Sequence, residues 1–220
     1  MKKNFLHVSF LLFNLLFTLL SFFCFNNIFL QELLTVTGFG LPFIIVILII
    51  LLLLFTVADL LLWPYTAKPL TILVLFFNAI CFYFMNTYHV SIDKIMLLNA
   101  FQTDLAEVSD LLSFRLFLCL LAGALLPALL ISRIDIRFLP WRQELRHRLI
   151  RAFFSIIIIG AIIFPNYKYT AQFLRNHRHL KYDLLPVNYF GAVISAVQII
   201  YKKHHPLVRI GTDAVFSPYW

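Results

Sequence analysis

The sequence predicts an all-α polytopic membrane protein with five transmembrane helices and additional amphipathic helices on the periplasmic side. Hydrophobic residues make up 62% of the chain, charged residues make up 13%, and the mean hydropathy is +0.90. A soluble domain usually has about 25% charged residues, so lipid is the expected main solvent. The two other observations behind this fold class are the five long apolar segments and the uneven distribution of Lys and Arg between them.

Five apolar segments reach or approach the length of about 20 residues that a transmembrane helix requires. These segments are 5–25, 41–63, 69–88, 114–132 and 149–165. The first follows two lysines, but its apolar run is long for a signal peptide and no small-residue cleavage site follows it. We therefore expect a retained span. The fifth segment is short, and we expect Phe164, Pro165 and Tyr167 to mark its interfacial end.

The basic residues predict the orientation of these spans. If the N-terminus is cytoplasmic, most Lys and Arg of the spans and short loops lie on the cytoplasmic side: Lys2, Lys3, Lys68, Arg133, Arg137, Arg142, Arg146 and Arg148. Cytoplasmic loops of membrane proteins carry this excess. We therefore expect an inner-membrane protein with loops 26–40 and 86–113 in the periplasm. The formal charge of +8 fits this topology and anionic lipid headgroups, so no nucleic-acid partner is expected.

The composition also suggests two parts. Residues 1–165 form the predicted five-span domain, and residues 166–220 form a periplasmic, membrane-associated tail that mixes basic and aromatic residues. Within the tail, roughly 189–203 carries an apolar stripe at helical spacing but is too interrupted for a confident span. A helix lying on the outer leaflet explains this pattern better.

The loop 86–113 is the polar segment that most resembles a functional site. Within it, apolar residues at spacings of three and four predict an amphipathic helix at about 93–112, which Asp93 could cap. Asn99, Thr103 and Glu107 recur every four residues and so share one helical face. This face is the candidate substrate-binding site. The alternative is that it is only the solvated side of a surface helix.

Two polar residues fall within the apolar spans. Asp59 is an intramembrane acid and therefore a functional candidate, although its closeness to Trp63 also allows it to reach the interface. Asn78 is expected to bond a neighbouring helix. Asp59 and the basic cytoplasmic loop leave open a second reading, a small non-enzymatic inner-membrane protein such as a transport or assembly subunit. No cysteine or histidine pattern indicates a metal site.

Several short segments carry a family resemblance. They are LLNAFQTDLAEVSDLL (97–112), LLPALL (125–130), FLRNHRHL (173–180), PVNYFGA (186–192) and PLVRIGTDA (206–214). In sequence, order and spacing they resemble the membrane domain of bacterial phosphoethanolamine transferases that modify lipid A. This group includes the mobile colistin-resistance enzymes, which confer polymyxin resistance. The resemblance covers essentially the whole chain.

The resemblance implies a five-helix membrane domain that precedes a periplasmic, zinc-dependent hydrolase-like domain. In this family, phosphoethanolamine passes from phosphatidylethanolamine to a Thr nucleophile and then to a phosphate of lipid A, a component of lipopolysaccharide. By motif, Asn99, Thr103 and Glu107 correspond to the donor headgroup site. Glu107 could pair with the ammonium group, while Asn99 and Thr103 could donate to phosphate oxygens.

The sequence departs from the family pattern at its end. The Thr nucleophile in its ETxR-type setting and the zinc ligands do not occur before Trp220. We therefore expect no catalytic residue and no metal or cofactor in this chain, with zinc confined to a missing catalytic domain. The expectation is a truncated or split phosphoethanolamine transferase that is inactive alone.

Overall fold

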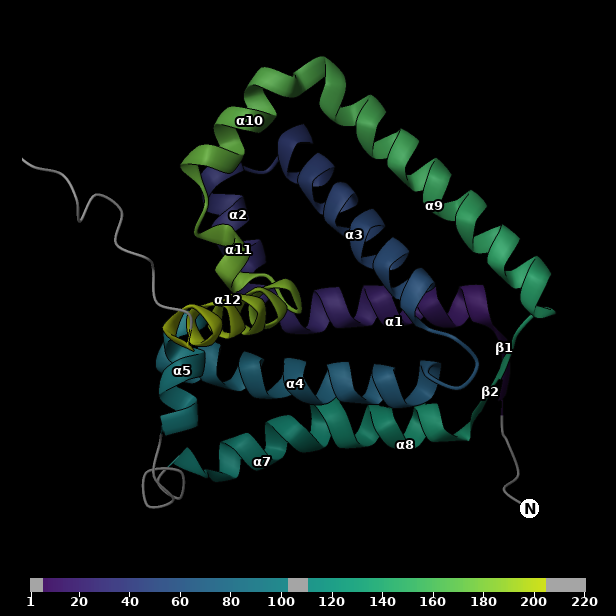
Figure 1. Ribbon diagram of the computed structural model, residues 1–220, viewed down its shortest axis with the longest axis horizontal. Helices are drawn as coiled ribbons and strands as arrows, with labels where there is room; N and C mark the ends of the chain where they lie inside the picture. The colour runs from purple at the N-terminus through teal and green to yellow at the C-terminus, as the bar shows by residue number, and fades with distance from the viewer. Residues whose placement is uncertain (1–5, 103–110, 205–220) are drawn as a thin grey trace, which may run out of the picture.

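The structure is a computed structural model that describes residues 6–102 and 111–204. Its described helices are α1 (Phe10–Phe25), α2 (Asn27–Thr37), α3 (Leu41–Leu61), α4 (Ala67–Tyr88), α5 (Lys94–Gln102), α7 (Phe114–Leu120), α8 (Leu126–Arg133), α9 (Trp141–Ile163), α10 (Tyr167–Asn176), α11 (Leu180–Asp183) and α12 (Val187–His204). Two short strands, β1 (Leu6–Ser9) and β2 (Ile134–Arg137), complete the described fold. Helices α1, α4 and the α7–α8 rod lie side by side, and α3 and α9 form a tilted pair beside them (Figure 1).

Within the described residues, four helical rods are long and apolar enough to cross a bilayer. They are α3, α4, the continuous rod Phe114–Arg133 and the rod Trp141–Asn176. A fifth span results if α1 and α2, which meet at a bend of 75°, are counted together. The predicted all-α polytopic architecture is therefore confirmed, and the protein is an integral membrane protein.

Three boundaries differ from the sequence prediction. The first segment, predicted from residue 5, begins with β1, and α1 starts only at Phe10. The expected outer loop 26–40 contains α2. The fifth helix begins at Trp141 instead of residue 149, and two charged residues of its first turns, Glu144 and Arg148, are buried rather than solvated.

The strands join segments that are distant in the sequence. β1 pairs with β2 in parallel, with Leu6 opposite Ile134 and Ser9 opposite Arg137. His7 Nδ1 lies 2.9 Å from Asp135 Oδ2 at this sheet. Neither strand is predictable from the sequence, because four-residue segments beside apolar spans carry no resolvable period of two.

The bend between α1 and α2 is stabilised by Asn26, which is 1% exposed. Its amide donates to the carbonyls of Phe22 and Leu185, each at 3.1 Å, and its Oδ1 accepts from the Leu185 N–H at 2.7 Å. Backbone groups freed at a helix break need such partners, since lipid offers none. Asn26 thereby fixes the loop that leads into α12.

A π-helical turn, Leu121–Leu125, joins α7 to α8. Pro127 has no N–H to donate to the carbonyl of Gly123, so the regular helical ladder is interrupted there. A Cβ on Gly123 would lie 3.0 Å from Phe25 and 3.1 Å from Ala79. A side chain at position 123 would therefore press on Phe25 and Ala79, where this rod approaches α1 and α4.

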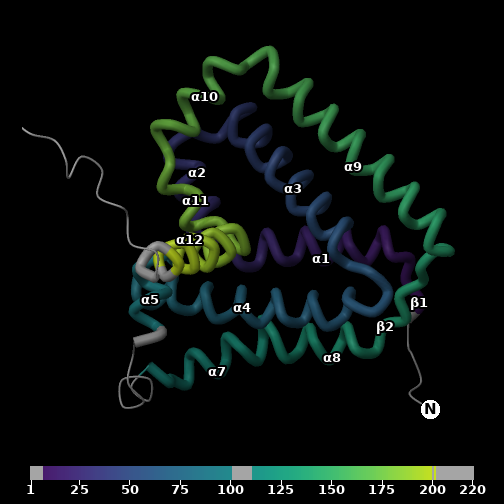
Figure 2. Tube along the Cα trace, in the orientation of Figure 1, coloured from purple at the N-terminus to yellow at the C-terminus, as the bar shows by residue number. Residues whose placement is uncertain are grey.

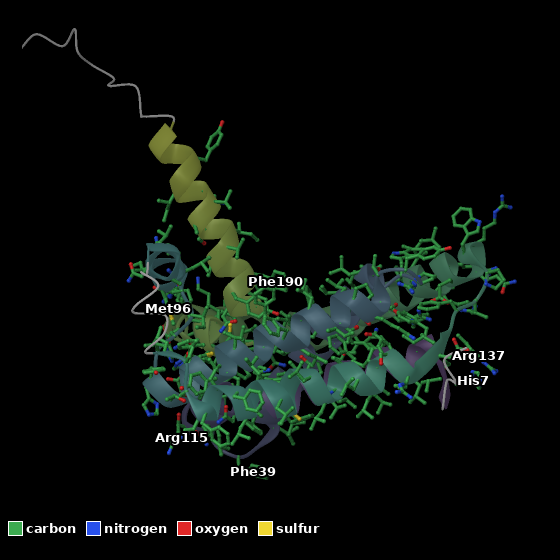
Figure 3. All side chains as sticks on the ribbon, turned by 90° about the horizontal axis from the view of Figure 1, so that it is seen from below. His7, Phe39, Met96, Arg115, Arg137 and Phe190 are labelled. Carbon is green, nitrogen blue, oxygen red and sulfur yellow. The ribbon has the colours of Figure 1, made fainter. Side chains whose placement is uncertain are left out.

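The spans end at two opposite sides of the molecule. Figure 3 shows His7 and Arg137 at one end of the molecule and Met96 and Arg115 at the other. We call the first the strand end and the second the α5 end. Helices α5, α11 and α12 lie close together at the α5 end, as the Cα trace also shows (Figure 2).

Candidate functional site

Helix α5 carries the predicted site and has a well-formed N-terminus. Asp93 Oδ1 accepts hydrogen bonds from the N–H groups of Ile95, at 3.0 Å, and Met96, at 2.8 Å. This confirms the predicted cap, because a short carboxylate satisfies amides that have no partner within the first helical turn. The cap fixes where α5 begins and which residues share each face.

Of the three predicted site residues, Asn99 lies on α5 and is exposed at the α5 end. Thr103 and Glu107 lie outside the described residues. The structure therefore gives the position of one member of the predicted face. Whether the three side chains bind a ligand together stays a prediction.

An apolar hollow of about 330 Å³ is lined in part by Ala100, the residue that follows Asn99 in the sequence. The hollow lies between α4, α5 and α7, and its other described lining residues are Ile80, Phe84, Leu111, Leu112, Leu116 and Leu120. Such a surface suits hydrocarbon chains, which gain by leaving water but need no hydrogen-bond partner. The sequence did not reveal this hollow because its residues come from three segments.

A second, more polar cavity of about 340 Å³ lies between α5, α11 and α12. Its polar lining residues are Asp93, Lys94, Lys181, Tyr182, Asn188, Ser195 and Gln198. Asn99 is not among its described lining residues. Two sites of different chemistry therefore lie beside α5, one apolar and one with two lysines.

A carboxyl cluster connects the segments around this cavity. Ser91 Oγ donates to Asp183 Oδ1 at 3.1 Å, and His179 Nε2 lies 3.7 Å from Glu32 Oε1. Burial and the neighbouring Glu32 carboxyl raise the pKa of Asp183 to about 6. Two adjacent carboxyl groups are stable when one is protonated and donates to the other. The cluster thus joins α2, α11 and the segment before α5.

The start of α12 is anchored in the helical bundle. Tyr189 OH donates to Asn78 Oδ1 at 3.1 Å, and Asn78 Nδ2 donates to Ser21 Oγ at 2.8 Å. The prediction that Asn78 bonds a neighbouring helix is confirmed, with α1 and α12 as its partners. A buried amide with both its oxygen and nitrogen satisfied holds these helices in one register.

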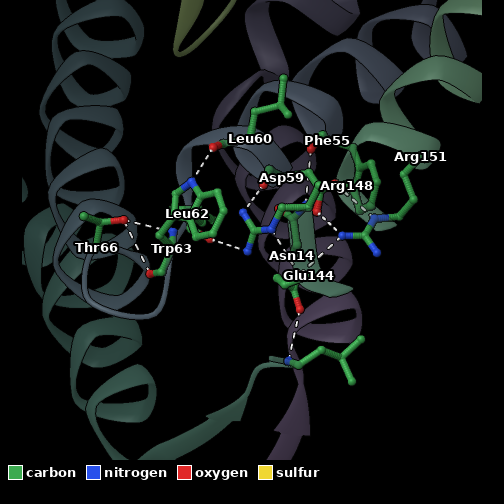
Figure 4. A network of polar contacts seen from close by, with 11 residues as sticks. Asn14, Phe55, Asp59, Leu60, Leu62, Trp63, Thr66, Glu144, Arg148 and Arg151 are labelled. Atoms are coloured by element: carbon green, nitrogen blue, oxygen red, sulfur yellow. Dashed lines mark hydrogen bonds and ion pairs between the residues drawn. The ribbon is translucent and has the colours of Figure 1, made fainter. Parts of the chain in front are cut away.

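At the strand end, Asp59 belongs to a buried ionic network (Figure 4). Asp59 is 1% exposed, and Arg151 reaches both of its carboxylate oxygens, at 2.9 and 3.0 Å. Arg148 Nε donates to Glu144 Oε1 at 3.0 Å, and its other nitrogens donate to the carbonyls of Asp59 and Leu62. Asp59 is therefore enclosed by protein and paired with Arg151, rather than extended toward water.

The residues present do not fit a zinc centre. Within 6–102 and 111–204, no three His, Cys, Asp or Glu side chains are grouped so that they could hold a metal ion. A zinc site needs several converging ligands of this kind. The zinc that the resemblance implies would therefore not be held by this part of the chain.

Comparisons of the sequence with known proteins identify related enzymes. A family model described as phosphoethanolamine transferase EptA/EptB matches residues 47–201. The chain is 33% identical over 168 residues to the phosphatidylethanolamine transferase Mcr-1 of Escherichia coli, covering 76% of this chain and 30% of that protein. It is 30% identical over 203 residues to the phosphoethanolamine transferase EptA of E. coli strain K12, covering 89% of this chain and 37% of that protein.

A solved structure shares the fold. It is the integral membrane protein lipooligosaccharide phosphoethanolamine transferase A (EptA) from Neisseria meningitidis, with a TM-score of 0.82 and 22% sequence identity. The match covers 92% of this chain and 39% of that chain. The chain spans about a third of the length of the curated relatives it matches.

The fold and the helices at the α5 end define a class: a polytopic membrane domain with amphipathic helices gathered at one end of its spans. The family match covers most of the described spans and ends at residue 201, within α12. The chain belongs to the phosphoethanolamine transferase EptA/EptB family. It corresponds to the membrane domain of these enzymes.

Proposed function

We propose that this chain is the membrane anchor and donor-binding domain of a phosphoethanolamine transferase that acts on lipid A. The proposal assigns it to the bacterial inner membrane, with the N-terminus cytoplasmic and the α5 end periplasmic. The observation that carries the proposal is the family match together with an exposed Asn99 on a helix that borders an apolar hollow. This arrangement offers a polar group and an apolar surface side by side, as a phospholipid requires.

The proposed donor is phosphatidylethanolamine. Its headgroup would be bound by Asn99, Thr103 and Glu107, with the Glu107 carboxylate paired to the ammonium group. The amide of Asn99 and the hydroxyl of Thr103 would donate to phosphate oxygens. The acyl chains would extend along the apolar hollow beside Ala100. The transfer itself would need the zinc-bearing domain that the family resemblance implies.

The rival reading as a transport or assembly subunit depended on Asp59 and the basic cytoplasmic loop. The described structure weakens it, because Asp59 forms two close contacts with Arg151 and is shielded from solvent.

The donor site can be tested by lipid binding to the full chain in maltoside micelles, which contain no phosphate. Short-chain phosphatidylethanolamine and phosphatidylglycerol are added in turn, and the retained lipid is counted by native mass spectrometry. Glu107→Gln should lower phosphatidylethanolamine occupancy about fivefold to tenfold, because it removes one charge-assisted contact. Phosphatidylglycerol has no ammonium group, so its binding should change little.

Asp135→Asn is the matched control, since it also neutralises one acid but lies in β2 at the strand end. Its phosphatidylethanolamine occupancy should equal that of the wild type. Wild-type binding by Glu107→Gln would refute the donor-site assignment. The orientation is tested separately with alkaline phosphatase fused at the C-terminus, which is active only in the periplasm; an inactive, expressed fusion would overturn the proposed topology.

A further inference from the structure

The cavity between α5, α11 and α12 is lined by two lysines that form no ion pair with another described residue. Lys94 and Lys181 both line it. Among the ion pairs of the described residues, neither ammonium group takes part. Lys181 Nζ lies 4.7 Å from the centre of the Tyr182 ring. Two lysines therefore line one cavity, and within residues 6–102 and 111–204 neither has a carboxylate partner.

The acid beside them does not neutralise the pair. Asp93 also lines the cavity, but its Oδ1 already accepts two backbone N–H groups of α5. Two lysines against one engaged aspartate leave the cavity with an excess of positive charge. Each ammonium group brings three donors and no acceptor. An anionic oxygen group is the ligand chemistry that this lining favours.

The α12 side of the cavity is shaped by small residues. Gly191, Ala192 and Ser195 lie on the helical face that lines it, between Asn188 and Gln198. A Cβ built on Gly191 would meet no heavy atom within 4 Å. The space is therefore open rather than filled by a neighbouring helix, and a larger side chain there would occupy the cavity without a backbone clash.

A different side of α12 is apolar and exposed. Phe190, Val193, Ile194 and Val197 are all between 45% and 61% exposed. The helix projects away from the layer of the spans, and Phe190 lies near its base (Figure 3). An amphipathic helix with this pattern at the end of a membrane bundle is expected to lie at the boundary between lipid and water. The cavity then opens where lipid headgroups are found.

We propose that this cavity binds the phosphodiester group of a membrane glycerophospholipid between Lys94 and Lys181. The site is separate from the Asn99 face, because residues five apart on a helix, such as Lys94 and Asn99, point about 140° away from each other. The proposal does not rest on the donor-site assignment. Bound lipid would hold α5 and α12 together at the membrane surface.

The test uses the full chain in maltoside micelles with short-chain phosphatidylglycerol, short-chain phosphatidylethanolamine or inorganic phosphate. Bound ligand is counted by native mass spectrometry. The double variant Lys94→Gln/Lys181→Gln should lose at least about tenfold in phosphatidylglycerol affinity, since each lysine near a phosphate contributes about fivefold. Gly191→Leu should cause a similar loss by filling the cavity while leaving both lysines in place.

Lys168→Gln is the matched control, because Lys168 is an exposed lysine of α10 that does not line the cavity. It should bind like the wild type, as should Glu107→Gln with phosphatidylglycerol, which separates this site from the donor site. Both lysines are exposed, so their substitution should leave the fold intact even if Gly191→Leu does not fold. Unchanged affinity in the lysine double variant would overturn the proposal, as would equal binding of inorganic phosphate and lipid.

Discussion

Replacement of Arg148 by alanine is the most informative single perturbation of this fold. The side chain is 0% exposed, and its guanidinium contacts Glu144 and the backbone carbonyls of Asp59 and Leu62. It also lies between two aromatic rings, 4.1 Å from the centre of Phe10 and 4.6 Å from that of Trp63. One residue of α9 therefore connects α1, the end of α3 and the loop that follows.

The expected cost follows from the groups left behind. Glu144, 4% exposed, would lose its ion-pair partner, and the carbonyls of Asp59 and Leu62 would lose donors. Breaking a buried ion pair costs about 3–5 kcal/mol. Arg151 lies 3.6 Å from Glu144 and can compensate in part, so we expect the lower part of this range, about 3–4 kcal/mol.

The assay is unfolding of the purified chain by sodium dodecyl sulfate in mixed micelles, followed by circular dichroism. A double-mutant cycle with Glu144→Ala isolates the pair, because removing both partners leaves no unpaired charge. The coupling free energy should be about 2 kcal/mol. A loss below about 1 kcal/mol for Arg148→Ala, or a cycle without coupling, would refute this reasoning.

Three further predictions concern the α5 end and the packing of the rods. Because the pKa of Asp183 is raised from 3.8 to about 6, folding favours its protonated form. The free energy of unfolding of the wild type should therefore fall by about 1–2 kcal/mol between pH 4 and 7. Asp183→Asn should remove this pH dependence; an unchanged pH dependence would show that Asp183 is not its source. Gly123→Val should destabilise the protein by about 1–3 kcal/mol through overpacking, measured by the same detergent unfolding, whereas Gly160→Val, which has open space, serves as the control. Asn78→Leu should make α12 more accessible to protease, since Ser21 and Tyr189 lose their partner; wild-type cleavage rates would show that this contact does not hold α12.

Much of the architecture was predictable because lipid imposes simple rules. A span must be long, apolar and helical, since no water is present to satisfy backbone groups. The predicted segments 41–63, 69–88 and 114–132 therefore agree closely with α3, α4 and the α7–α8 rod. Asn78 and Asp93 were also predicted correctly, because a buried amide and a helix cap have few alternative partners.

The errors have a common cause. The start of α9 contains Glu144 and Arg148, charged residues that normally indicate a loop outside the bilayer. Their burial became possible only because the partners Asp59 and Leu62 approach from α3. Similarly, α2 was expected to be a loop, but its residues pack with α11 and α3. Local composition does not reveal such partners.

The candidate site was predictable only in part. The spacing of Asn99, Thr103 and Glu107 indicated a shared helical face, and the structure describes Asn99 as an exposed residue of α5. The apolar hollow and the two-lysine cavity were not predicted. Lys94 and Lys181 are far apart in the sequence, and only the contact between α5 and α12 creates the space that they line.

The sequence by itself determined the solvent, the approximate spans, the family and one polar helical face. These properties depend on the transfer free energies of individual residues and on short-range spacing, and both can be evaluated for each segment without knowing its partners. The tertiary structure decided which distant groups meet: Asp59 with Arg151, 92 positions apart, and Asn26 with Leu185, 159 positions apart. Such pairs exist because a polar group in a lipid-embedded fold must find its partner inside the protein, and only the packing of the helices determines which partner is within reach.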